Sequence, residues 1–258
     1  VAIHTPEFAF EKKIENVEDA MQRFGLTFPV VLDNDYATWN AYGNRYWPRK
    51  YLIDVHGNIV YDHIGEGAYE ETEAKIVELL EELHAEKGTE IEMNTADSPQ
   101  IPSAFERTSG GGTPEIYFSS RRNEFLANGE KGRSGEQNFE LPETQSLNEL
   151  YLAGTWNIDE ESATNVSEGA QIVLAYRASK VFMVLGAESP TRVEIKRDGK
   201  YLTKDSAGND ILFDGEVSYM IVEKEKLYQI IETDSVANHV FELTVPGSGL
   251  QAFTFTFG

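Results

Sequence analysis

Hydrophobic and polar positions give the first 88 residues the pattern of a mixed α/β domain. Short apolar runs predict strands at residues 1–4, 28–32, 51–55 and 59–64. Helical spacing of apolar residues predicts helices at 14–24, 36–42 and 69–87. In the last helix Ile76, Leu79, Leu80 and Leu83 share one face, and glutamates occupy the other. The predicted order is strand, helix, strand, helix, hairpin and helix, which is an α/β order.

The pattern becomes irregular between Thr89 and about Leu147. Prolines and glycines are frequent there, and periodicity is weak, which predicts linker or loop-rich structure. One short aromatic strand is expected at residues 115–118.

From residue 150 onward the chain reads as all-β. Strands recur roughly every ten residues, with turn signals such as Asp198-Gly199 between them, and this spacing predicts a sandwich or jelly roll. Phe253, Phe255 and Phe257 alternate with Thr254 and Thr256, so the three phenylalanines are expected on one face. The expected strands are 151–157, 171–178, 180–185, 191–197, 211–213, 219–222, 227–232, 240–245 and 252–257.

The charge balance narrows the classes of partner. The chain has 22 Lys+Arg against 44 Asp+Glu, a net charge of −22. Nucleic-acid binding needs clustered cations, so no nucleic-acid partner is expected. No apolar run is long enough to span a bilayer. There are no cysteines, which excludes disulfides and thiolate metal sites from this chain and leaves the redox compartment open.

Other motifs of catalysis and cofactor binding are weak. None of the five histidines forms a helical metal-binding pair, and no Gly-x-Ser-x-Gly nucleophile elbow occurs. Gly110–Gly112 is expected to be a flexible loop, because it opens no helix that could cradle a phosphate. The loop Asp205–Asp210 lacks the spacing of a calcium site and is best explained as a solvated turn. No metal or cofactor site is therefore predicted.

The loop before the strand at residues 51–55 contains Trp47-Pro48. Cis peptide bonds occur almost only before proline, but most such bonds are trans, so the residues alone favour trans. The segments VAIHTPEF, FPVVLDND and AYGNRYWPRKYLIDVHGNIV, however, together resemble a thioredoxin-like domain of the TlpA/redoxin type. This resemblance implies that Pro48 is a cis-proline, and that Tyr46, Trp47 and Pro48 form a loop that binds an extended substrate.

The same resemblance implies a redox site that this chain holds only in part. Glu7 corresponds to an acid that lies near the family's cysteine pair and accepts a proton, whereas His4 is expected to pack at the end of a strand. The family's Cys-x-x-Cys lies just before VAIHT, on a strand that would run between residues 1–4 and 51–55. The first domain is therefore expected to be N-terminally incomplete, with its catalytic thiols upstream.

Later motifs extend the resemblance over nearly the whole chain. TPEIYFSSRR, LAGTWNIDEE and QAFTFTFG resemble the C-terminal region of DipZ-type proteins. That family joins a CcdA-like membrane domain, a thioredoxin-like domain and a β-sandwich similar to carbohydrate-binding modules. The implied organisation is a thioredoxin-like domain at 1–88, a linker at 89–112 and a carbohydrate-binding-module-like sandwich at 113–258.

Two functions follow from this resemblance. The first is an extracytoplasmic thiol–disulfide oxidoreductase, tethered to the membrane through a region outside this sequence, that passes electrons from the CcdA-like domain to protein disulfides. The chain alone is expected to be inactive because it lacks cysteine, and whether it counts as an enzyme stays open. The alternative is glycan or cell-wall binding on a non-catalytic scaffold. Aromatics that could stack on a sugar are Trp156, Tyr176, Tyr219 and Tyr228, although burial in a core or interface is favoured for each.

Overall fold

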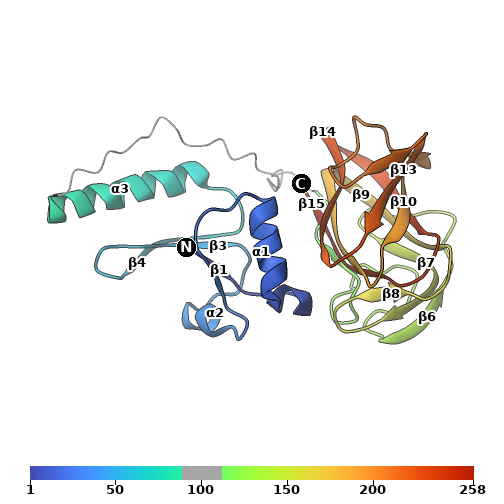
Figure 1. Cartoon of the computed structure of the whole chain (residues 1–258), viewed down its shortest axis with the longest axis horizontal. Coiled ribbons are helices and arrows are strands. Elements are labelled where there is room, and N and C mark those ends of the chain that lie inside the picture. Colours follow the sequence, from blue (N-terminus) through green and yellow to red (C-terminus); the bar gives the residue numbers. More distant parts are fainter. Residues whose placement is uncertain (89–111) are drawn as a thin grey trace. The chain divides into compact units, whose positions relative to one another are not determined.

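The computed structural model describes residues 1–88 and 112–258 (Figure 1). The chain divides into two compact units, Val1–Glu106 and Arg107–Gly258. The predicted linker, residues 89–112, lies outside the described residues except for Gly112. None of the described helices is both long and apolar enough to cross a membrane.

The first unit follows the element order that the sequence predicts, with an added turn of 3-10 helix. The elements are β1 (Ala2–His4), η1 (Ala9–Lys12), α1 (Ile14–Arg23), β2 (Val30–Leu32), α2 (Ala37–Ala41), β3 (Arg49–Ile53), β4 (Ile59–Ile64) and α3 (Tyr69–Lys87).

The strands of the first unit form two separate two-stranded sheets. β1 pairs in parallel with β2, with Ala2 opposite Val30, and β3 pairs with β4 in an antiparallel hairpin. Asp54 closes this hairpin because its carboxylate accepts hydrogen bonds from the backbone N–H of His56 (2.9 Å) and Asn58 (2.8 Å). The hairpin turn that the sequence predicts is confirmed.

Burial in the first unit is concentrated at one corner. Among residues 1–86 and 88, the buried ones are Thr5, Pro6, Phe8 and Asp33. Each sheet leaves large apolar side chains in solvent, because a two-stranded sheet has too few neighbours to cover both of its faces. The exposed side chains on the four strands are Ile3, Val31, Ile53, Ile59, Val60 and Ile64.

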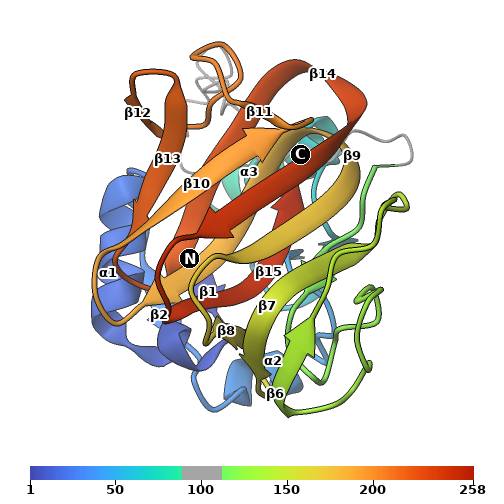
Figure 2. The same ribbon diagram turned by 90° about the vertical axis from the view of Figure 1, so that its right-hand side faces the viewer.

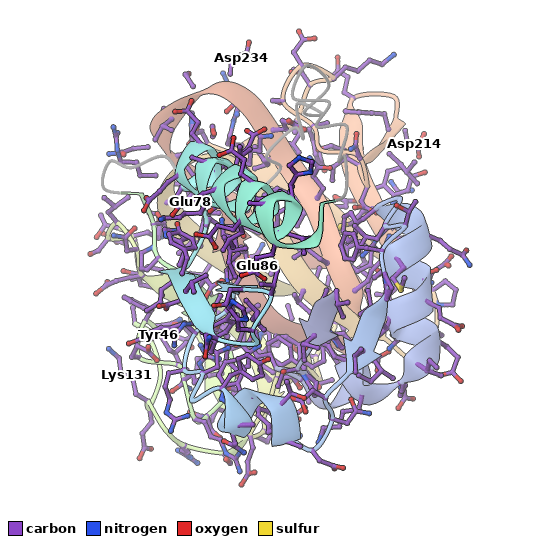
Figure 3. All side chains as sticks on the ribbon, turned by 90° about the vertical axis from the view of Figure 1, so that its left-hand side faces the viewer. Tyr46, Glu78, Glu86, Lys131, Asp214 and Asp234 are labelled. Carbon is purple, nitrogen blue, oxygen red and sulfur yellow. The ribbon has the colours of Figure 1, made fainter. Side chains whose placement is uncertain are left out.

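Helix α3 has the acidic outer surface that its sequence predicts. Glu78 and Glu86 lie along this helix (Figure 3), where Glu78 pairs with Lys75 at 2.6 Å and Glu86 with His56 at 3.1 Å. The helix ends at Gly88, which has a φ of 59° and therefore adopts the left-handed conformation that suits glycine.

The second unit is all-β, as predicted. All of its described strands belong to a single hydrogen-bonded sheet, and their buried side chains form one hydrophobic core. The strands are β5 (Ile116–Tyr117), β6 (Gly135–Phe139), β7 (Leu150–Ile158), β8 (Ala163–Asn165), β9 (Ala170–Ala187), β10 (Thr191–Arg197), β11 (Lys200–Tyr201), β12 (Leu212–Asp214), β13 (Val217–Val222), β14 (Lys226–Val245) and β15 (Leu250–Phe257).

Two long curved strands, β9 and β14, organise this unit (Figure 2). The first half of β9 pairs with β7 and the second half with β15, while β14 follows β9 along both halves. Between Glu232 and Ala237 the register of β14 shifts, and a bulge of this kind lets a strand bend while its pairing continues. The sequence predicted two strands in each case, and the structure joins each pair into one.

The structure also corrects the predicted strands elsewhere. β6 lies in a stretch that was expected to be loop, and β8 and β11 are too short to give a periodic signal. The expected alternation in β15 is broken by a register shift between Ala252 and Thr254. Phe255 and Phe257 belong to the core cluster, whereas Phe253 is buried outside it, so the three phenylalanines do not form one continuous face.

Candidate functional site

The buried corner of the first unit is built around the Asp33 carboxylate. Asp33 follows β2, and it accepts hydrogen bonds from the backbone N–H of Thr38 (2.9 Å) and Trp39 (2.8 Å) in the first turn of α2. The Thr5 hydroxyl donates a third hydrogen bond at 3.1 Å. One side chain therefore satisfies two backbone N–H groups in the first turn of α2 and also fastens that helix to the segment after β1.

The environment of Asp33 favours its charged form. Desolvation acts to raise the pKa of the carboxyl, but the hydrogen bonds from Thr38, Trp39 and Thr5 outweigh it, and the pKa is lowered from the ordinary value of 3.8. The corner is held by a carboxylate that stays ionised at neutral pH.

Trp47 joins the loop before β3 to this corner. Its indole N–H donates to the carbonyl oxygen of Thr5 at 3.1 Å, and its ring packs on Trp39 with centroids 4.2 Å apart. The Trp47–Pro48 peptide bond is cis, so the prediction based on the family resemblance is confirmed, against the trans bond that the residues alone favoured. The carbonyl of Pro48 accepts a hydrogen bond from Gly65 N–H at 2.8 Å, which fixes the loop to the end of β4.

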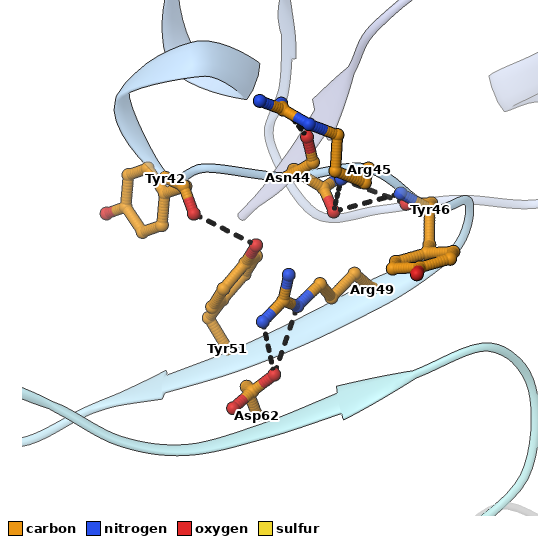
Figure 4. Close-up of polar contacts among 7 residues, drawn as sticks. All are labelled: Tyr42, Asn44, Arg45, Tyr46, Arg49, Tyr51 and Asp62. Carbon is orange, nitrogen blue, oxygen red and sulfur yellow. Dashed lines mark hydrogen bonds and ion pairs between the residues drawn. The ribbon is translucent and has the colours of Figure 1, made fainter.

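Asn44 organises the other end of this loop (Figure 4). Its side-chain oxygen accepts hydrogen bonds from the backbone N–H of Arg45 (2.8 Å) and Tyr46 (3.3 Å), and its amide group donates to the Tyr46 carbonyl at 3.1 Å. Side chains of this kind replace backbone hydrogen bonds in turns. The loop therefore has a defined conformation although it contains no regular secondary structure.

β3, the strand that follows the loop, carries Arg49, whose positive charge is neutralised by a carboxylate on β4. Nε and Nη2 of Arg49 donate to the same carboxylate oxygen of Asp62, at 3.0 and 2.6 Å, across the β3–β4 pair. The Arg49 guanidinium also lies over the Tyr51 ring, and the Tyr51 hydroxyl donates to the Tyr42 carbonyl at 3.4 Å. In Figure 4 Tyr46, Arg49 and Tyr51 lie on the same side of the loop.

Glu7, the acid suggested by the resemblance, lies in the same buried corner between Pro6 and Phe8. Its backbone N–H donates to a carboxylate oxygen of Glu11 at 2.7 Å, and Phe8 N–H donates to the same oxygen at 3.4 Å. The Tyr36 hydroxyl donates to the carbonyl of neighbouring Pro6. The role of the Glu7 carboxylate as a proton acceptor stays a prediction.

Glu11 is an acidic residue that the sequence reasoning missed. Desolvation is the largest influence on it and raises the pKa of its carboxyl above 4.5, although the hydrogen bonds from Glu7 and Phe8 and the nearby His4 act in the opposite direction. Glu11 is the third residue of η1, and Phe8 at the N-cap is not the Ser or Thr of a capping box, so no local sequence signal marked this acid. The Nε2–H of His4 donates to the Glu11 carbonyl oxygen (3.1 Å), in keeping with the packing role expected for it.

The aromatic residues considered for sugar stacking are mostly internal. Trp156, Tyr176 and Tyr228 are buried in the core of the second unit, so their ring faces cannot meet a sugar. Tyr219 is half-buried, and the Arg192 guanidinium covers its ring at 3.9 Å from the centroid. Core packing, the explanation favoured for each residue, is what the structure shows for the first three.

The described residues hold no group of three or more His, Asp or Glu side chains that could bind a metal ion. The chain contains no cysteine, so it supplies no thiol of its own for disulfide chemistry. What the corner offers is a rigid, partly aromatic loop next to an acidic segment.

Comparison with known proteins gives one family match. The protein-family model described as "Thioredoxin like C-terminal domain" matches residues 113–258. Over its whole length the chain is 33% identical to Protein DipZ of Mycobacterium tuberculosis, of which it covers 34%. The chain therefore spans about a third of the length of that relative.

Two further matches are partial. A stretch of 44 residues, 17% of the chain, is 48% identical to the thiol-disulfide oxidoreductase ResA of Geobacillus thermodenitrificans and covers 25% of it. A solved family 6 carbohydrate-binding module superposes with a TM-score of 0.28 and 13% identity, covering 56% of this chain and 92% of the module. That score is too low to assign a fold.

Proposed function

The chain belongs to the family of thioredoxin like C-terminal domains through residues 113–258, and on this premise we propose that it is the C-terminal part of an extracytoplasmic thiol–disulfide oxidoreductase. In this proposal residues 1–88 belong to a thioredoxin-like domain, and residues 113–258 form a sandwich similar to carbohydrate-binding modules. The similarity of the whole chain to DipZ, and of one part to ResA, supports the assignment.

The contact between Trp47 and Thr5 carries the proposal. It brings the loop before β3 against the segment that follows β1, although 42 positions separate the two residues. A redox site of this family needs both elements side by side, because the loop binds the substrate and the segment supplies an acid. In our proposal Tyr46, Trp47 and Pro48 receive an extended polypeptide, and Glu7 accepts a proton from a nearby thiol.

We further propose that a strand from outside this sequence lies between β1 and β3. Their separation into two sheets leaves one edge of each strand without a strand partner among the described residues. The apolar side chains that β1 and β3 expose, Ile3 and Ile53 among them, support a surface that is covered in the longer protein. Such a strand would bring the Cys-x-x-Cys segment next to Pro48.

The proposed chemistry is thiol–disulfide exchange. A thiolate of the longer protein attacks a substrate disulfide and forms a mixed disulfide, and one substrate sulfur leaves as a thiolate. The second cysteine then breaks the mixed disulfide, so the substrate becomes a dithiol and the protein holds the disulfide. Two electrons from a CcdA-like membrane domain restore the dithiol. The 258-residue chain contributes the substrate-binding loop at Tyr46, Trp47 and Pro48 and the acid Glu7. It cannot catalyse the exchange alone, because it has no thiol.

The test is reduction of an insulin disulfide by dithiothreitol in the presence of the longer protein. We expect catalysis by the form that contains the upstream segment, loss of catalysis when its cysteines are replaced by serine, and no catalysis by the 258-residue chain. If the upstream segment contains no cysteine pair, the proposal is wrong.

Glycan binding by the second unit is the weaker candidate. Three of its four candidate aromatics are buried, and the fourth lies under Arg192. A glycan array on the whole chain would decide, and absence of binding to every glycan would remove this alternative.

A further inference from the structure

Trp47 is an exposed aromatic residue that is nevertheless held in place. Half of its side chain, 51%, faces solvent. The rest is fixed by the Trp39 ring at 4.2 Å and by the hydrogen bond from its indole N–H to Thr5. A fixed aromatic surface loses little conformational entropy when a ligand covers it, and tryptophan is enriched among residues that dominate binding energy.

The loop around Trp47 is cationic in a strongly acidic chain. Residues 36–53 contain Arg45, Arg49 and Lys50 and no carboxylate, although the whole chain carries −22. Arg49 is neutralised by Asp62 at 2.6 Å. The Arg45 and Lys50 side chains donate instead to backbone carbonyls, those of Asn44 and Gly67, each at 2.6 Å. Neither of these two cations has a carboxylate partner in the part of the chain that the structure describes.

Arg45 is close enough to influence a ligand on Trp47. The Cα atoms of Arg45 and Trp47 are two residues apart and therefore at most about 7 Å from each other, and charges are screened over about 8 Å at physiological ionic strength. Figure 4 shows the Arg45 side chain turned back over Asn44, with the Tyr46 ring on the opposite side of the loop. A carboxylate bound beside Arg45 on this loop would therefore meet a positive charge that no described carboxylate neutralises.

We propose that Trp47 selects the polypeptide substrate: its exposed indole face binds a large apolar or aromatic side chain, and Arg45 favours a carboxylate next to that side chain. This inference rests on the proposed function and names the substrate class of the same loop. It assigns recognition to the side chain of the residue before Pro48. A neutral glycan would also stack on an indole, but it would gain nothing from the positive charge of Arg45.

Titration of the whole 258-residue chain with short peptides tests the inference, with the indole N–H signals of Trp39 and Trp47 followed by NMR. The peptides are acetyl-Gly-Asp-Phe-Gly-Gly-amide and two relatives, one with Ala for Phe and one with Lys for Asp. We expect the Phe peptide to bind about three- to tenfold more tightly than the Ala peptide. The Asp peptide should bind more tightly than the Lys peptide, with a difference that shrinks at high salt.

Matched variants separate the parts of the proposal. Trp47→Ala should abolish the preference for Phe over Ala, and Trp47→Phe, which keeps a ring, should retain part of it. Arg45→Gln should remove the preference for Asp over Lys only. Phe24→Ala is the control, because Phe24 is also 51% exposed but lies at the C-terminal end of α1. An unchanged amide spectrum in Trp47→Phe shows that the unit still folds.

Three outcomes would overturn the inference: no movement of the Trp47 signal with any peptide, equal affinity for the Phe and Ala peptides, or movement with a soluble oligosaccharide alone. Peptide binding involves no thiol, so its failure is distinguishable from failure of the insulin assay. Binding with no redox activity in the longer protein would remove the proposed function and keep the recognition site.

Discussion

The hydroxyl of Thr5 donates a hydrogen bond to the carboxylate of Asp33 at 3.1 Å, and both residues are buried. Thr5 follows β1 and Asp33 follows β2, so the bond ties together the ends of two parallel strands at one edge of their sheet. The same carboxylate holds α2, and the Thr5 carbonyl holds Trp47. These two residues thus connect the ends of β1 and β2, helix α2 and Trp47.

Removal of the Thr5 hydroxyl should loosen this corner. In Thr5→Val the shape is nearly kept but one hydrogen bond to a charged acceptor is lost, so we expect a cost of about 1–3 kcal/mol in the free energy of unfolding of the first unit. Urea denaturation followed by the fluorescence of Trp39 and Trp47 measures it. Thr5→Ser, which keeps the hydroxyl, should cost less. Equal losses in the two variants would show that the methyl group matters and the hydrogen bond does not.

The lowered pKa of Asp33 gives the first unit a dependence on acid pH. A carboxyl whose folded pKa lies below its unfolded value contributes stability above the unfolded value of 3.8, and that stability is lost as pH falls through the folded pKa. We expect Asp33→Asn to be less stable than the parent chain at pH 7, with a difference that shrinks below about pH 4. Urea titrations at pH 7 and pH 3 provide the comparison. A difference that stays constant with pH would contradict the prediction.

Glu11 should show the opposite dependence. Burial raises the pKa of its carboxyl above 4.5, so the folded state binds the proton more tightly and stability falls as pH rises from 4.5 through the raised pKa. Glu11→Gln keeps an oxygen that can accept from Glu7 and Phe8 and removes the charge. We therefore expect the variant to gain stability relative to the parent chain between pH 4.5 and pH 7, measured by thermal unfolding. If the stability of Glu11→Gln relative to the parent chain were lower at pH 7 than at pH 4.5, the pKa of Glu11 would be lowered by folding and not raised.

The sequence correctly predicted the elements that depend on neighbouring residues alone. The order of elements in the first unit, the Asp54 hairpin and the Asp198-Gly199 turn between β10 and β11 follow from residue types that favour particular backbone angles. Strand bends are different. β9 changes its pairing partner from β7 to β15, and β14 shifts its register against β9, without either strand ending. A break in periodicity looks the same whether a strand ends or bends.

The residues of the candidate site also differ in whether the sequence could identify them. Trp47-Pro48 and Glu7 were identifiable through family resemblance. Trp39 was not, because its contact with Trp47 joins two elements with no pattern shared between them. Side chains that meet only through tertiary packing leave no trace in local spacing.

Trp156 should act on stability rather than on ligand binding. Its ring is buried and its indole N–H donates to the Ala153 carbonyl at 2.9 Å. Trp156→Phe leaves a cavity and an unsatisfied carbonyl, and we expect a loss of about 1–3 kcal/mol in the second unit, measured by urea unfolding monitored by circular dichroism. Tyr219→Phe, at a half-buried position, should stay within about 0.5 kcal/mol of the parent chain. A Trp156→Phe chain of unchanged stability would mean that Trp156 does not support the core.

Gly208 lies where the loop after β11 touches β14, and its lack of a side chain is required there. A Cβ at this position would lie 2.3 Å from the carbonyl oxygen of Gln229 and 2.8 Å from the nitrogen of Ile230, both backbone atoms that cannot rotate away. The hydrogen bond from Gly208 N–H to the Ile230 carbonyl, at 2.8 Å, keeps the two segments at this separation. Gly208→Ala must therefore push the loop from β14, at a cost of about 1–3 kcal/mol. Gly247→Ala is the matched control, since a Cβ there meets nothing within 4 Å and the backbone has no positive φ. Thermal unfolding of both variants should show a lowered midpoint for Gly208→Ala alone, and equal midpoints would show that the loop can move away from β14 without loss.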